Sequence, residues 1–337
     1  MSLEKHLILK SELHSPSKFK KKERKYIEFL KNFIEKESGI IFDFEELGDL
    51  FLSACRINEF GIITTRGRKL FLDEEKVLKW VKEKLLPNTV ITSIADEDII
   101  RLLIFCIEIT YQMFEGGTKA TITQKGFRER RRTFESILVD QFVGKLGEVM
   151  VKKFLENNFS SKIELDWEIS REIEKYRNDI INATKNISIK TSPSLAGIWA
   201  EADLGYDYGI SVKCSVPQPT LLQFFIEVCG FSRLLDFAET KIPSSDKRFK
   251  CYLHEMRLRI KEYKCGEIQT KLKGFICGYF KTSEYKPVKE GKVLPYLGKV
   301  RETRYLVPLN KLRYTKKEWG SFLKDTGLFL EGTLKKI

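Results

Sequence analysis

An aspartate and a lysine, Asp179 and Lys190, lie eleven positions apart in the middle of this chain. The segments 178–181 and 187–190 are short and apolar, and a polar stretch over 182–186 separates them. This pattern predicts two strands joined by a turn. Pairing of the strands could bring both side chains to the same face at the same end. A carboxylate binds a hard divalent metal, and a lysine beside it can handle a proton.

A third candidate, Glu148, precedes Asp179 by thirty-one residues in the segment 144–148 (GKLGE). Apolar residues near a 3.6 period predict a helix over 133–157. Two glycines inside a helix cost roughly 1 kcal/mol each against alanine, which indicates close packing or ligand approach. Phosphodiester hydrolysis needs a metal, an activated water and a nearby cation. We expect Asp179 and Glu148 to bind the metal and Lys190 to orient or deprotonate the water.

Composition favours a nucleic-acid partner and an oxygen-bound metal. The chain has 337 residues and a formal charge of +13, with the basic excess spread along its length, and a broad basic surface attracts polyanions. Seven cysteines without a C-x-x-C pair and three dispersed histidines argue against a disulfide framework, a zinc ribbon or a histidine site. The expected cofactor is therefore Mg²⁺, with Mn²⁺ as the alternative. No apolar run suits a membrane span or a signal peptide, so we expect a cytoplasmic protein.

Hydrophobic periodicity divides the chain into a helical N-terminal region over 1–132 and a mixed domain over 133–337. The N-terminal region is expected to contact DNA or a second subunit. The predicted helices of that region cover 23–37, 43–56, 73–86 and 96–115. Residues 60–69 are expected to form a basic hairpin or wing, or else an ordinary connector. In the second region we predict strands over 162–168, 208–216, 274–280 and 303–308, with helices over 220–237 and 248–264. The fold class is α/β (α+β), a mixed β-sheet flanked by helices.

The Gly-Glu helix followed by Asp-Ile, a turn and Ile-Lys resembles the core of the PD-(D/E)XK nuclease superfamily, over about residues 135–230. The basic format is similar to that of a type II restriction endonuclease. The resemblance implies an αβββαβ core, Mg²⁺-dependent cleavage of double-stranded DNA, a homodimer and a cognate DNA methyltransferase. Asp179 then takes the aspartate position, Lys190 the lysine position and Glu148 the helix glutamate position. Asn178 replaces the proline, and Ser188 replaces the second acidic ligand, which leaves that ligand unassigned.

A second Ser-x-Lys pattern, Ser211-Val212-Lys213, offers an alternative site. Some enzymes of this superfamily take the acidic group from the helix that follows the strand, and Glu227 lies fourteen residues after Lys213. Its strand carboxylate would be Asp179, Asp203 or Asp207. We favour Asp179 with Lys190 because the strand–turn–strand pattern is clearer there.

A cluster of arginines precedes the predicted helix over 133–157. These residues either contact DNA phosphates or form a solvated helix start, and they are Arg128, Arg130, Arg131 and Arg132.

The combined pattern predicts a type II-like restriction endonuclease that hydrolyses DNA by in-line attack of water, without a covalent enzyme intermediate. A structure-selective repair or junction nuclease with the same core is the nearest enzymatic alternative. A basic DNA-binding protein with structural carboxylates is the non-enzymatic alternative.

Overall fold

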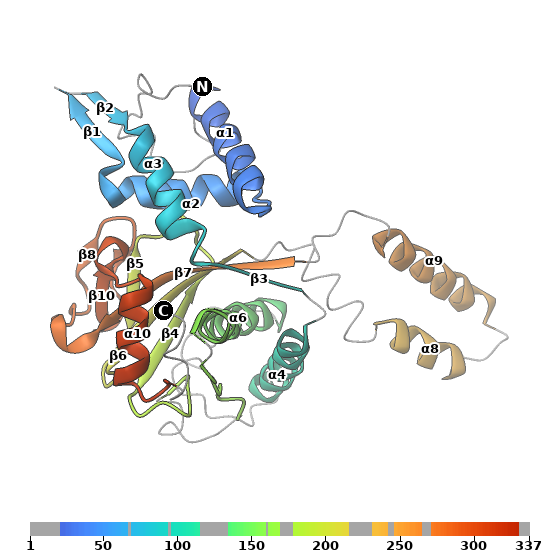
Figure 1. Cartoon of the computed structure of the whole chain (residues 1–337). Helices are drawn as coiled ribbons and strands as arrows, with labels where there is room; N and C mark the ends of the chain where they lie inside the picture. The colour runs from blue at the N-terminus through green and yellow to red at the C-terminus, as the bar shows by residue number, and fades with distance from the viewer. Residues whose placement is uncertain are drawn as a thin grey trace.

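The centre of the structure is a mixed β-sheet of four strands (Figure 1). The computed structural model describes residues 21–66, 69–93, 96–114, 134–159, 161–168, 178–215, 231–241, 246–264 and 271–329. The strands follow the order β3 (Thr89–Ser93), β7 (Lys271–Lys281), β6 (Tyr208–Ser215) and β4 (Ile187–Ser192). β4 and β6 are parallel, whereas β7 is antiparallel to both β6 and β3. The predicted mixed sheet is therefore confirmed.

Alternation along β6 separates two hydrophobic layers, because successive strand residues point to opposite faces. Ile210 and Val212 belong to one layer, and Ser211 and Lys213 point to the other side. The first layer contains three helices, α4 (Glu97–Phe114), α6 (Phe134–Phe159) and α10 (Lys316–Asp325). The second contains the antiparallel strands β5 (Trp199–Ala202) and β10 (Tyr305–Pro308) and the helices α1 (Lys21–Ser38), α2 (Phe44–Arg56) and α3 (Glu74–Trp80). The sheet is thus covered on both faces, as the prediction required.

Helix α2 shows how the N-terminal helices attach to the sheet. A capping box starts the helix, in which the Asp43 backbone N–H donates to Glu46 Oε2 at 3.0 Å. Glu46 also forms a buried ion pair with Lys273 of β7. The same carboxylate therefore caps the N-terminus of the helix and docks it on the sheet. Strand β3, from the predicted N-terminal region, adds to this connection by pairing with β7.

The remaining described elements are shorter or lie at the periphery. They are η3 (Glu59–Gly61), β1 (Ile63–Arg66), β2 (Lys69–Leu72), η4 (Val81–Leu85), α8 (Phe231–Lys241), α9 (Lys247–Lys264), η6 (Thr282–Glu284), β8 (Val293–Leu294), β9 (Gly298–Lys299) and η7 (Leu309–Lys311). Helices α8 and α9 pack on each other and stand clear of the sheet in Figure 1. β1 and β2 pair antiparallel over 63–66 and 69–72, so a hairpin is present, about three residues further along the chain than the predicted 60–69. Residues 67 and 68 lie outside the described residues.

The local periodicity predicted the helices better than the irregular strands. The helices predicted over 23–37, 43–56 and 96–115 correspond to α1, α2 and α4, and that over 73–86 to α3 with η4. The predicted strand over 162–168 is wrong, because this stretch pairs only through an isolated bridge between Leu165 and Ile180. Of the helix predicted over 220–237, the first part lies outside the described residues, and α8 extends the rest to Lys241.

The contact between α6 and β4 depends on a glycine. A Cβ atom at Gly147 would lie 1.8 Å from Thr191 Oγ1 and 2.9 Å from Thr191 Cβ. Thr191 Oγ1 in turn donates to the Gly144 carbonyl oxygen at 2.8 Å. The missing side chain at Gly147 therefore allows the helix to approach the strand closely, which gives one of the two helix glycines a packing function.

We expect Gly147→Ala to lower the free energy of unfolding by about 1–3 kcal/mol relative to Gly144→Ala, because overpacking displaces Thr191. At Gly144 an added Cβ meets no atom within 4 Å, so alanine there should stabilise the helix by up to about 1 kcal/mol. Urea denaturation of both variants measures the difference. Equal free energies of unfolding for the two variants would show that the close contact between α6 and β4 does not contribute to stability.

Candidate active site

Glu148 lies on the face of α6 that packs against the sheet, and its side chain is buried, with 9% of the residue exposed. Lys145, one helical turn earlier, places its Nζ 2.5 Å from Glu148 Oε2. The same ammonium donates to the backbone carbonyl of Asp166. It also lies 5.2 Å from the ring centroids of both Phe105 and Trp167. Lys145 thus contacts a carboxylate, a backbone carbonyl and two aromatic rings, which together compensate an ammonium charge.

Asp179 is fixed to the edge of β4 by two hydrogen bonds. Its backbone N–H donates to the Ile187 carbonyl oxygen at 3.1 Å, and its Oδ2 accepts from the Ile189 backbone N–H at 2.6 Å. The next residue, Ile180, forms the bridge to Leu165. A turn is present at 181–182, and β4 begins at Ile187, but the predicted strand over 178–181 is wrong, because Ile180 alone of these residues forms a bridge, and its partner is Leu165. These contacts orient the Asp179 carboxylate before any ligand binds.

The structure brings Glu148 and Asp179 close enough to interact electrostatically, and the charge of Asp179 makes ionisation of Glu148 less favourable. Burial raises the pKa of Glu148 well above its usual range, and the charge of Asp179 raises it further, while Lys145 opposes both. Burial also raises the pKa of Asp179, which the Ile189 N–H and the charges of Lys145 and Lys190 counteract. Lys145 is therefore the cation shared by the two acids.

Lys190 lies on a different side of β4 from these carboxylates. Thr191 faces α6, so strand alternation directs Lys190 and Ser188 to the opposite face. There Lys190 Nζ forms a half-exposed ion pair with Asp203 at 2.6 Å. Its charge still lowers the pKa of Asp179. The predicted lysine is thus near the predicted aspartate, but its direct partner is Asp203.

Ser188, at the position of the missing second acidic ligand, is 1% exposed, and its hydroxyl has no hydrogen-bond partner among the described residues. Ser188 therefore adds no oxygen ligand to a metal held by Glu148 and Asp179. In the described ranges, no three histidine, cysteine, aspartate or glutamate side chains come together as a metal site. The donors that do meet are two carboxylates, and their hard oxygens and mutual repulsion fit a divalent cation completed by water.

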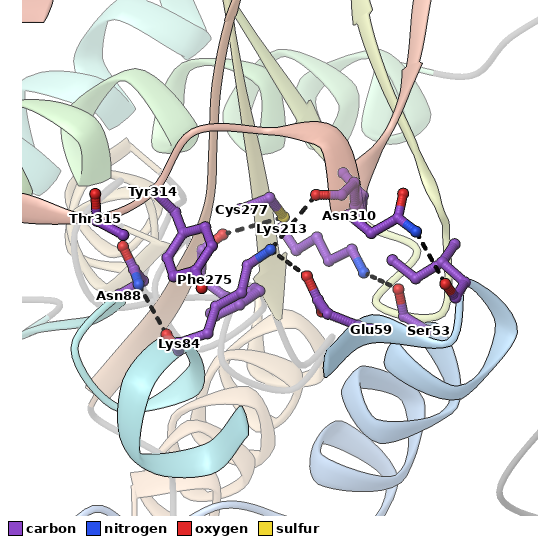
Figure 2. A network of polar contacts seen from close by, with 12 residues as sticks. Ser53, Glu59, Lys84, Asn88, Lys213, Phe275, Cys277, Asn310, Tyr314 and Thr315 are labelled. Atoms are coloured by element: carbon purple, nitrogen blue, oxygen red, sulfur yellow. Dashed lines mark hydrogen bonds and ion pairs between the residues drawn. The ribbon is translucent and has the colours of Figure 1, made fainter. Parts of the chain in front are cut away.

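The alternative lysine, Lys213, lies in a polar network between β6 and the N-terminal helices (Figure 2). It is 3% exposed, and its Nζ donates at 2.7 Å to both Ser53 Oγ and the Leu195 carbonyl oxygen. Burial lowers its pKa to about 8, although Glu59 and Asp49 oppose this shift. The acids nearest Lys213 therefore come from the N-terminal helices.

Other predicted residues of the alternative site are placed separately. Asp207 Oδ2 accepts from the Asn186 backbone N–H at 2.9 Å and so joins the residues that precede β4 and β6. Asp203 binds Lys190. Glu227 and the four arginines of the DNA-binding prediction lie outside the described residues, and these arginines are Arg128, Arg130, Arg131 and Arg132.

Lys145 is the candidate functional residue that sequence reasoning missed. Its signal was present in the segment 144–148, because residues three apart on a helix face the same way. The helix-borne lysine contacts Glu148 directly, whereas neither strand lysine does.

Comparison of the chain with protein-family models, with curated proteins and with solved structures found no match. Among the helices in the described ranges, none combines the length and the apolar character needed to cross a membrane.

We expect Lys145→Met to lower the free energy of unfolding by about 3–5 kcal/mol at neutral pH, because it leaves a buried carboxylate unpaired. The folded-state pKa of Glu148 rises further in this variant. Its stability should therefore recover as the pH falls and Glu148 binds a proton. The double variant Lys145→Met/Glu148→Gln should regain most of the loss at neutral pH. Urea denaturation across pH measures both, with Lys162→Met, in an exposed ion pair, as the control that changes little. A pH-independent loss would contradict the pairing.

For Lys213, the folded-state pKa of about 8 lies below the ordinary value of 10.5. Between these values the unfolded chain holds more protons than the folded one, so stability rises with pH through this window. Wild type should gain roughly 3 kcal/mol relative to Lys213→Met between pH 8 and 10.5. Denaturation series on both proteins, with exposed Lys316→Met as the control, measure the gain. A constant difference would show that Lys213 stays charged in the fold.

Proposed function

We propose that this protein is a metal-dependent deoxyribonuclease that hydrolyses phosphodiester bonds in double-stranded DNA. The more specific form of the proposal is a cytoplasmic type II-like restriction endonuclease that acts as a homodimer alongside a cognate DNA methyltransferase. The observation that carries the proposal is the pair of buried carboxylates, Glu148 and Asp179, that share Lys145. The formal charge of +13 supports a polyanionic substrate.

Glu148 and Asp179 are the residues that would hold Mg²⁺ or Mn²⁺. When bound, the metal would supply stabilisation of charge on the phosphate and a more acidic water. The protein's own groups prepare the site for this. The Ile189 N–H holds the Asp179 carboxylate in place, and Lys145 favours the ionised form of Glu148, which is the form that binds a cation.

The reaction adds water across one P–O bond. Water attacks phosphorus in line with the leaving sugar oxygen, which departs and takes a proton, so no bond to the enzyme forms. Lys145 lies beside the two carboxylates and can stabilise negative charge that develops on the phosphate. Lys190 can contribute in the same way if its half-exposed pairing with Asp203 is exchanged for a phosphate.

The Lys145 ion pair also supports the non-catalytic alternative, in which both carboxylates are structural and the protein only binds DNA. A buried acid that is neutralised by a lysine needs no metal.

Incubation of the purified protein with unmethylated plasmid and phage DNA in Mg²⁺ or Mn²⁺ tests the proposal. We expect discrete fragments that EDTA abolishes. Glu148→Gln and Asp179→Asn should each slow cleavage on the order of 10²–10³-fold, as removal of one preorganised charge does elsewhere. The exposed-helix variant Glu239→Gln should cut like wild type, which controls for a general effect of losing a carboxylate.

Comparison of lysine variants locates the cation. Lys145→Arg and Lys190→Ala should both reduce cleavage, whereas Lys213→Met, which lies away from the two carboxylates, should leave the cleavage rate unchanged. Intact DNA with both metals, despite measurable binding, would favour the non-catalytic protein. Cutting of branched DNA without cutting of plasmid would favour the structure-selective nuclease.

A further inference from the structure

A basic β-ribbon projects from the C-terminal part of the chain. We define the basic hairpin as residues 285–304, which include β8 and β9 (Figure 1). Five of its cations are exposed and have no carboxylate partner among the described residues, and they are Lys286, Lys289, Lys292, Lys299 and Arg301. Residues 286–301, which hold these five cations, contain one acid, Glu290. The other acid of the basic hairpin, Glu302, pairs with Arg304. Unpaired cations at this density repel one another, and a bound polyanion would relieve that repulsion.

The basic hairpin is held rigidly at its base and near its tip. At the base, Val288 and Arg304 exchange backbone hydrogen bonds of 2.8 and 3.2 Å. Nearer the tip, the Trp199 indole N–H of β5 donates to the Pro295 carbonyl oxygen at 2.8 Å. A ribbon fixed in this way loses little conformational entropy when it binds a partner.

The tip of the hairpin exposes apolar groups beside the lysines. Tyr296 has a φ of +60° and is 49% exposed, and the Arg56 guanidinium of α2 lies 4.4 Å from its ring centroid. Val293 is 73% exposed. A positive φ at a non-glycine residue costs energy, and such residues cluster at functional sites. The tip thus offers an aromatic ring, an arginine and a branched apolar side chain together.

We propose that the basic hairpin is a docking surface for duplex DNA. A two-stranded ribbon has the dimensions to enter the major groove, and lysines along its strands can contact the flanking phosphates. Arg304 at its base binds Glu201 of β5 at 2.7 Å, two residues from Asp203, the partner of Lys190. The base of the hairpin therefore adjoins strand β4. This inference rests on the proposed function only in making the bound DNA a substrate.

Two triple charge reversals in the full-length protein test the proposal. One is Lys289→Glu/Lys292→Glu/Lys299→Glu in the basic hairpin. The matched control, Lys316→Glu/Lys317→Glu/Lys324→Glu, makes the same charge change on α10, which packs on the opposite face of the sheet. Both are made in an Asp179→Asn background and measured in EDTA, so that cleavage cannot interfere. The Kd for a 30-base-pair duplex is measured from 50 to 200 mM salt.

We expect the hairpin reversal to flatten the plot of log Kd against log salt by roughly three, close to one for each lost phosphate contact. The control should keep the wild-type slope. Circular dichroism should show both variants folded, since all six lysines are exposed. Equal slopes in the two variants, or a hairpin variant that binds like wild type, would overturn the proposal.

Vesicles of phosphatidylserine and phosphatidylcholine separate DNA from a lipid surface as the partner. Hairpin-dependent binding to these vesicles, with unchanged DNA binding, would overturn the DNA assignment in favour of an anionic membrane. Hairpin-dependent DNA binding by a wild-type protein that cuts nothing with Mg²⁺ or Mn²⁺ would support this inference while the proposed nuclease fails. Metal-dependent cleavage that does not depend on the hairpin lysines would support the proposed nuclease and overturn this inference.

Discussion

The close approach of α6 to β4 is the constraint on which the candidate site depends. Gly147 leaves room for the Thr191 side chain, so the helix can approach the strand closely. Thr191 also donates a hydrogen bond to the carbonyl of Gly144, which holds the helix at that distance. Glu148 follows directly along the helix, and Asp179 is bound to the backbone of β4. A helix kept further away by one methyl group would separate the two carboxylates. The close packing at Gly147 therefore sets how near Glu148 lies to Asp179, and so how strongly the two carboxylates interact.

The structure uses two buried lysines in opposite ways. Lys145 contacts a carboxylate, so its positive charge is compensated. Lys213 contacts neutral oxygens of Ser53 and Leu195, and burial lowers its pKa to about 8. Both rest in low-dielectric surroundings, so the difference lies in the partners. In Figure 2 the ion pair of Lys84 with Glu59, which joins η4 to η3 within the N-terminal region, lies beside Lys213. Lys84 also donates to the Leu309 carbonyl oxygen at 3.4 Å, which links this region to η7. Buried ion pairs of this kind add little net stability.

Local patterns in the sequence predicted most helices and the inner strands, because the apolar residues that one element buries recur at a fixed spacing along the chain. The meeting of Glu148 with Asp179 was also expected, from a helix followed by a strand–turn–strand. The direct pairing of Lys190 with Asp203 was not, although Asp203 follows Lys190 by only thirteen residues. The pairing of β3 with β7 joins residues far apart in the sequence, such as Thr89 and Phe275. Contacts of that kind depend on which strands meet, and no local period records it.

Strand β4 ends the order of the described sheet, and this position connects the two proposals. The carboxylates lie on the α6 side, and the basic hairpin lies on the side of β5. A sheet with packed layers on both faces admits no ligand through its middle. A duplex that binds the hairpin and also reaches Asp179 must therefore pass around the edge at β4. Lys190 lies at that edge, and its pairing with Asp203 is half-exposed and hence weak. A DNA phosphate arriving there would compete with the half-exposed Asp203 carboxylate for the lysine, and Lys190 would then pair with the substrate in place of Asp203.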